Sequence, residues 1–106
     1  MSNLLRSLSI KDIYAESRSL QKELERLRSR IDVIDENLLD VISERMHVVE
    51  QLGQFKKANN LTVLQQPRWE QIQQIVSEGA KNRGLDVAFI EELFQLLHQA
   101  AIDSQS

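Results

Sequence analysis

The chain has no cysteine among its 106 residues, which excludes disulfides, zinc–thiolate sites and thiol chemistry. With only two histidines, a histidine-rich metal site is not expected. No stretch approaches the ~18 uncharged apolar residues of a membrane span, and the N-terminal apolar run is too short for a secretory signal. A net charge of -3 gives no electrostatic case for nucleic acid. We therefore expect a cytoplasmic protein without membrane or nucleic-acid partners.

Proline and glycine are also scarce, at one and three residues, which favours a few long helices. From residue 18 to residue 57, apolar residues recur mostly at steps of three and four, the period of a helix. No alternating apolar and polar run with turn dipeptides predicts a strand. We expect the first helix to begin between Ser9 and Ser17 and to run to about Ala58. The apolar stripe comprises Leu20, Leu24, Leu27, Ile31, Ile34, Leu38, Val41, Ile42, Val48, Val49, Leu52 and Phe55.

Two shorter helices are expected after a connector, Asn59 to Gln66. Pro67 suits the first turn of the second helix, where its missing N–H is not needed. That helix should end near Arg83, because Gly84 is a good residue just beyond a helix C-terminus. Asp86 is a good cap for the third helix. The sequence thus predicts an all-α chain of three helices, one of them very long.

The length of the first helix points to a second copy of the chain. At ~1.5 Å per residue, a helix of about forty to fifty residues spans roughly 60–75 Å. A compact chain of this size has a radius of gyration near ~13 Å. Two shorter helices cannot cover such a rod, whereas a second copy lying antiparallel could. We therefore expect a homodimer with extensive helix exchange.

Two cations, Arg45 and Lys56, fall on or beside the apolar stripe of the first helix. They are eleven residues apart, close to three helical turns, so they share one face at a separation of ~16 Å. A buried cation is costly unless it meets an anion, and no acidic residue on the stripe is placed to neutralise both. An anionic ligand is one explanation. A buried ion pair for Arg45, and stabilisation of the helix C-terminus by Lys56, are the others.

Two further arginines could join such a site. Arg28 lies ~25 Å before Arg45 along the helix and could reach the same ligand only from a second chain. Its charged surroundings also suit a solvated ion pair. Arg68 lies near the positively polarised start of the second helix, where anions are favoured, although it could be a surface residue. No nucleophile–base pair is visible.

Three aromatic or imidazole side chains have mainly structural interpretations. Trp69 is expected in the core rather than as a stacking platform. His47 and His98 have no partner motif, so we expect them to be structural or on the surface.

The segment LRSRIDVIDENLLDVISERMHVVEQLGQFK closely resembles the opening helix of the all-helical, bacterial type II chorismate mutase family. That family's pattern is LR..ID.ID..LL..L..R followed by G..K. Its functional positions fall on Arg28, Arg45 and Lys56, with Gly53 as the glycine. The resemblance continues through VLQQPRW and GLDVAFIEELFQLLHQAAIDSQ and covers about residues 20 to 105. It implies a domain of residues 20–106 after an N-terminal extension, 1–19, of unknown role.

The resemblance implies an intertwined dimer that converts chorismate to prephenate in aromatic amino-acid biosynthesis. The reaction is an intramolecular pericyclic rearrangement, which needs no nucleophile, metal or cofactor. Catalysis would come from holding the flexible substrate in its reactive shape and from stabilising negative charge on the breaking ether oxygen. Association with another shikimate-pathway enzyme is left open.

The same resemblance assigns roles to individual residues. Arg45, together with Arg28 of the partner chain, would bind the two substrate carboxylates. Lys56 and Gln105 would donate hydrogen bonds to the ether oxygen, and Arg68 would support the site from the second helix.

The sequence departs from the familiar bacterial form at three positions. Gln65, Trp69 and Ala101 stand where that form has aspartate, glutamate and serine, which contact the ring hydroxyl and a carboxylate. Gln65 can still form a hydrogen bond to a substrate. These changes also suit an isochorismate-pyruvate lyase or a mutase for an amino analogue of chorismate. A third hypothesis is a non-catalytic helical dimerisation or regulatory module.

Overall fold

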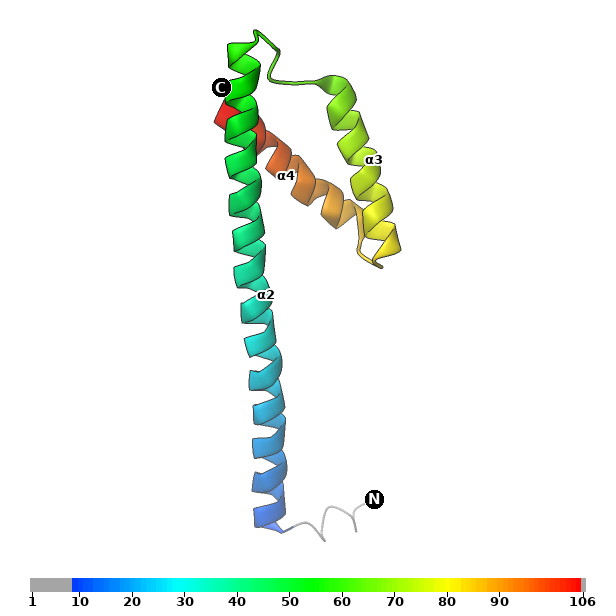
Figure 1. The fold of residues 1–106 in the computed structure, drawn as a ribbon. Helices are drawn as coiled ribbons and strands as arrows, with labels where there is room; N and C mark the ends of the chain where they lie inside the picture. Colours follow the sequence, from blue (N-terminus) through cyan, green and yellow to red (C-terminus); the bar gives the residue numbers. More distant parts are fainter. Residues whose placement is uncertain (1–8, 106) are drawn as a thin grey trace. The chain divides into compact units, whose positions relative to one another are not determined.

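The computed structural model describes residues 9–105, which form three helices and no strand (Figure 1). They are α2 (Ile10–Ala58), α3 (Gln66–Asn82) and α4 (Val87–Gln105). The prediction of an all-α chain with one very long N-terminal helix is confirmed. Within the described range, no helix is both long and apolar enough to cross a membrane.

Helix α2 begins with reciprocal hydrogen bonds between Ser9 and Asp12. The Asp12 backbone N–H donates to Ser9 Oγ at 3.1 Å, and the Ser9 backbone N–H donates to Asp12 Oδ2 at 3.3 Å. Two backbone donors that the first turn leaves without helical partners are thereby satisfied. The expected start between Ser9 and Ser17 is confirmed at its early limit.

At its other end, α2 stops at Ala58 and is followed by a left-handed residue, Asn60, whose φ is 56°. The Leu61 N–H donates to the Lys56 carbonyl at 2.8 Å, and the Asn60 N–H donates to the Lys57 carbonyl at 3.4 Å. Asparagine tolerates this conformation better than most residues, so it can end a helix in the way glycine usually does. The chain reverses here, and residues 59–65 turn back beside the last turn of α2.

Helix α3 begins at Gln66, one residue before the expected start, and Pro67 lies within its first two positions. It ends at Asn82, and Arg83 is its C-terminal cap residue. Boundaries of this kind shift by one residue because the cap is only partly helical.

The turn between α3 and α4 provides hydrogen-bond partners for backbone groups at the end of α3 and at the start of α4. Gly84 has a φ of 67°, which a side chain would strain, and the Leu85 N–H donates to the Ala80 carbonyl at 2.9 Å. Asp86 Oδ1 accepts a hydrogen bond from the Phe89 N–H at 3.1 Å, so the expected cap of α4 is confirmed. The two helices form a hairpin whose members pack against each other.

The chain divides into two compact units, Met1–Val41 and Ile42–Ser106. In the first unit, every residue from Ser9 to Val41 is exposed, including Leu20 at 68% and Leu27 at 43%. A single amphipathic helix has nothing of its own on which to bury its apolar stripe.

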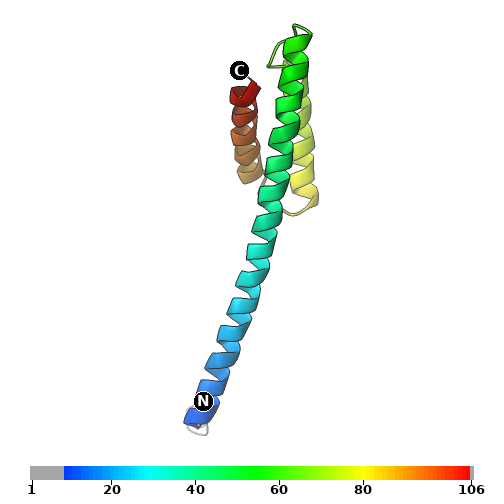
Figure 2. The same ribbon diagram turned by 60° about the vertical axis from the view of Figure 1, so that its left-hand side comes forward.

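The second unit contains the end of α2 together with α3 and α4. Figures 1 and 2 both show the C-terminal end of α4 beside the C-terminal turns of α2. Three apolar side chains are buried in this unit, and so is one cation: Val49, Ala80, Ala101 and Lys56. This buried cation marks the site described next.

Candidate active site

A cavity of about 230 Å³ lies among the end of α2, the connector, the start of α3 and the end of α4. All of its lining residues belong to the second unit. Five of the six site residues that we predicted line it: Arg45, Lys56, Gln65, Arg68 and Gln105. Trp69 and Ala101 also line the cavity. The cavity is therefore lined by all three residues at which the sequence differs from the familiar bacterial form, the third being Gln65.

Lys56 is the most buried cation of the cavity, with 9% of its surface exposed. Its Nζ donates to the Val63 carbonyl at 2.6 Å and to Gln105 Oε1 at 2.9 Å. Because an ammonium group has three N–H donors, one remains for a ligand. These specific contacts exceed what a simple helix-end charge would make.

Gln105 is the last residue of α4, and both ends of its amide are engaged. Its Oε1 accepts from Lys56, and its Nε2 donates to the Ala101 carbonyl at 3.0 Å. The second N–H of the amide remains available. The Lys56–Gln105 pair therefore keeps two hydrogen-bond donors available for a ligand.

Gly53 allows α4 to approach α2 at the point where Gln105 sits. A Cβ at this position would lie 2.9 Å from Gln105 Cγ, 3.3 Å from its Cβ and 3.4 Å from its Cα. The first distance is shorter than real Cβ contacts, and the crowded atoms belong to the root of the side chain and the backbone. The end of α4 thus makes a close approach to α2 at this glycine.

We expect Gly53→Ala to displace Gln105 and, for a reaction catalysed in this cavity, to lower kcat by about 10²-fold, because a misplacement of ~1 Å costs about that much. Alanine adds roughly 1 kcal/mol of helix propensity, so α2 itself should not weaken. Gly79→Ala is the matched control, because its Cβ would meet only the tip of the flexible Arg83 side chain, at 3.0 Å. Steady-state kinetics and circular dichroism measure the effect; equal activity in the two variants contradicts this role for Gly53.

Arg45 has a buried guanidinium nitrogen without a partner. Its Nη1 is the one buried side-chain nitrogen or oxygen in residues 9–105 that has no hydrogen bond. Leaving a buried charged donor unpaired costs more than the ~1–3 kcal/mol typical of a neutral group. An anion that enters the cavity would remove this cost.

Arg68 and Gln65 line the cavity from its connector side, and both are largely exposed. Arg68 Nη1 donates to Gln71 Oε1 at 2.6 Å, and Gln65 Nε2 donates to the Thr62 carbonyl at 2.9 Å. Arg28, the sixth predicted residue, belongs to the first unit and is not among the lining residues.

Trp69 and His98 form a stacked pair in the wall of the cavity. Their ring centroids are 3.7 Å apart with 10° between the ring planes, and both residues line the cavity. Burial, and secondarily the positive charge of Arg45, lower the pKa of His98. We expected Trp69 in the core rather than as a stacking platform, and His98 to be structural or on the surface. The stack was not predicted, because it joins two helices and leaves no signal in either one.

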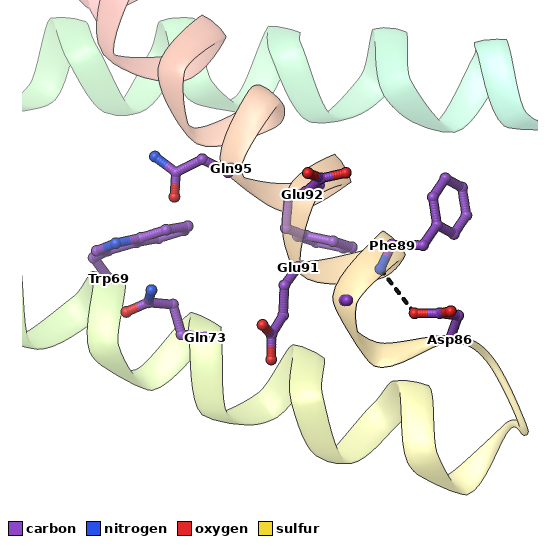
Figure 3. Close-up of a pocket in the computed structure, with 9 residues that line it drawn as sticks. Trp69, Gln73, Asp86, Phe89, Glu91, Glu92 and Gln95 are labelled. Atoms are coloured by element: carbon purple, nitrogen blue, oxygen red, sulfur yellow. Dashed lines mark hydrogen bonds between the residues drawn. The ribbon is translucent and has the colours of Figure 1, made fainter.

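A second cavity, of about 570 Å³, lies on another side of Trp69, between α3 and α4. Figure 3 shows Trp69 and Gln73 projecting from α3 toward α4. Its lining includes the carboxylates of Asp86, Glu91 and Glu92 and no lysine or arginine. These charges would repel an anion, so the smaller cationic cavity is the better candidate for a dicarboxylate site.

Comparison with known proteins agrees with this geometry. Residues 27–106 match the family model of chorismate mutase type II. The chain belongs to this family. Membership supports a chorismate-mutase-type, isomerase-class function, and it confirms the resemblance found in the sequence.

Two curated relatives are 4-amino-4-deoxychorismate mutases from Streptomyces. The protein from Streptomyces pristinaespiralis is 28% identical over 74 residues, which are 70% of this chain and 57% of the relative. The protein from Streptomyces venezuelae is 27% identical over 77 residues, which are 73% of this chain and 75% of the relative. The chain thus spans little more than half the length of the first relative. No solved structure gives a significant match.

Proposed function

We propose that this chorismate mutase family member catalyses the rearrangement of chorismate to prephenate. The supporting observation is that the Lys56–Gln105 donor pair and the unpartnered Nη1 of Arg45 line the same cavity. A substrate with two carboxylates needs cations to bind it. A transition state with charge on an ether oxygen needs hydrogen-bond donors, and the cavity contains both groups.

The chemistry requires no group that gains or loses a proton. The C–O bond of the enol ether breaks while a new C–C bond forms, and the electrons move around one six-membered ring of substrate atoms. Negative charge grows on the ether oxygen as its bond to carbon lengthens. In this proposal, the remaining N–H of Lys56 and the remaining amide N–H of Gln105 donate to that oxygen. Donors already held in place stabilise the transition state more than mobile water does.

Binding must also bring the two reacting carbons together. Arg45 offers a planar guanidinium, which matches the geometry of a carboxylate better than an ammonium group does. Arg68 adds a second cation from α3. Holding both carboxylates restricts the substrate to conformers close to the reactive one, and this restriction is itself a large part of catalysis.

We infer that the second carboxylate is bound by Arg28 of a second copy of the chain, in an intertwined homodimer. The exposed stripe of the first unit supports this inference, because a helix with that pattern is stable in water only when another surface covers it. Two copies related by a two-fold axis would cover each other's stripes with the same contacts, made twice.

We assign the catalytic domain to residues 20–106, preceded by an N-terminal extension of residues 1–19. The family match begins at residue 27, seventeen residues after α2 begins at Ile10. The first helix thus continues through the proposed boundary, so residues 10–19 of the extension add length to α2. Residues 1–8 of the extension lie outside the described residues.

A second candidate substrate is 4-amino-4-deoxychorismate, because both curated relatives are mutases of that compound. The same donors and arginines would serve, since the two substrates differ only at ring position 4. The absence of any Asp or Glu from the described cavity lining favours the neutral 4-hydroxyl over a 4-ammonium group.

The deciding experiment is an assay of the purified protein with chorismate, 4-amino-4-deoxychorismate and isochorismate, with product identification. We expect prephenate from chorismate at the highest kcat/KM. A higher kcat/KM for the amino compound transfers the assignment to that substrate. Pyruvate and salicylate from isochorismate alone indicate a lyase, and no product from any of the three contradicts an enzymatic role.

A further inference from the structure

The stacked pair of Trp69 and His98 has no part in the mechanism above, although it forms a wall of the same cavity. Trp69 comes from the first turn of α3 and His98 from the middle of α4. Parallel rings 3.7 Å apart fix each other's planes and cover one face of the imidazole. What His98 can offer the cavity is therefore its ring edge, which carries two nitrogens, and its other face.

The substrate groups can be matched to the lining one by one. Arg45 is assigned to one carboxylate and Arg28 of the second copy to the other, with Arg68 as a supporting cation. Lys56 and Gln105 are assigned to the ether oxygen. The flat diene ring and its substituent at C4 remain. An aromatic wall suits the ring, and the C4 substituent requires a polar group that is not a cation.

Apart from Gln105, which is assigned above, two lining side chains can both donate and accept a hydrogen bond, Gln65 and His98. Gln65 is exposed, and its Nε2 is tied to the Thr62 carbonyl. His98 is half-buried and already held against an aromatic ring. A fixed, partly desolvated group discriminates better than a mobile surface one, because a mismatch there leaves it without a partner.

We propose that His98, held against Trp69, contacts the C4 substituent of the substrate ring and sets the choice between a 4-hydroxyl and a 4-amino substrate. This inference rests on the proposed function of the cavity. His98 acts here as a specificity residue, with no role in the bond changes.

The charge state of His98 determines which of the two substrates it can bind. The titratable groups that line the cavity with it are Arg45 and Lys56 of α2 and Arg68 of α3, all cations. Its lowered pKa keeps the imidazole neutral at pH 7, with one nitrogen that donates and one that accepts. A neutral imidazole can donate to or accept from a hydroxyl group, and it can accept from an ammonium group. A protonated one can only donate, so it would repel the ammonium and still serve the hydroxyl.

The test compares His98→Phe, which keeps a ring to stack on Trp69, with His98→Gln, which keeps a donor and an acceptor. We expect His98→Phe to lower kcat/KM about five-fold for chorismate and about fifty-fold for 4-amino-4-deoxychorismate, mainly through KM, because hydrogen bonds to charged groups are the stronger ones. His98→Gln should recover most of both losses. A compound that is not turned over is measured as a competitive inhibitor.

The controls separate a specificity role from a structural one. His47→Gln changes the other histidine, which is exposed and outside the cavity lining, and should leave both values unchanged. In the wild type, kcat/KM for the amino compound should fall more steeply from pH 7 to pH 5 than for chorismate, and His98→Gln should abolish that difference. An unchanged selectivity in His98→Phe, or a shift seen instead in Gln65→Ala, overturns the proposal.

An NMR measurement tests the role of His98 independently of whether the proposed reaction occurs. In an NMR titration of the wild-type imidazole signals, assigned with His47→Gln, the chorismate dianion should raise the pKa of His98. If no substrate reacts but this shift occurs, the proposed reaction fails while the contact with His98 stands. If turnover occurs without the shift, the role of His98 is wrong.

Discussion

Replacing Lys56 by alanine should lower kcat for chorismate by about 10³-fold, the upper end of what losing one oxyanion donor costs. Two separate losses both lower kcat. The ammonium that would meet the ether oxygen is removed, and Gln105 Oε1 loses the donor that orients its amide at 2.9 Å. Because the lost interaction is made chiefly in the transition state, KM should change much less than kcat. Steady-state kinetics with chorismate measure both kcat and KM.

The neighbouring Lys57→Ala is the matched control. Lys57 is exposed, lies outside the lining of the cationic cavity and shares the helix end with Lys56. Its loss should leave kcat within two-fold of the wild type, because a surface charge contributes little. Thermal unfolding by circular dichroism checks that the cavity of Lys56→Ala is still formed. A folded Lys56→Ala protein with more than a tenth of wild-type kcat contradicts the assigned role.

The helices could be predicted from the sequence because their signals are local. The reciprocal contacts of Ser9 with Asp12, the left-handed Gly84 and the cap at Asp86 each involve residues within a few positions of one another. Long helical periodicity without proline then leaves little choice between these ends. The exchange of helices between two copies rests on the exposed stripe and remains a proposal.

The candidate site could be predicted only in part. Arg45 and Lys56 stand out because a cation on an apolar stripe is costly, and the unpartnered Nη1 of Arg45 agrees with that reasoning. Gln105 has no such signal, since a glutamine near a chain end is ordinary, and only the family resemblance indicated it. The stack of Trp69 on His98 depends on the packing of α3 against α4, which neither helix encodes alone.

A mixture of an Arg28→Ala chain with an Arg45→Ala chain should regain activity that neither variant has by itself. Each variant alone should lose at least about 10²-fold in kcat/KM, because one carboxylate of the substrate is left without its charged partner. If Arg28 acts across the dimer, a mixed dimer contains one site with both arginines and one with neither. Random exchange makes about half of the dimers mixed, so activity should reach about a quarter of wild type.

The matched control mixes Arg45→Ala with the double variant Arg28→Ala/Arg45→Ala, a combination in which no site can hold both arginines. Native mass spectrometry should show that subunits have exchanged in both mixtures before rates are compared. Recovery in the first mixture alone means that Arg28 completes the site of the other chain, as the exposed first unit suggests. If exchange is complete and the first mixture stays at the level of its parents, Arg28 does not cross between chains. The second carboxylate would then need a cation from within one chain, and Arg68, which already lines the cavity, is placed to supply it.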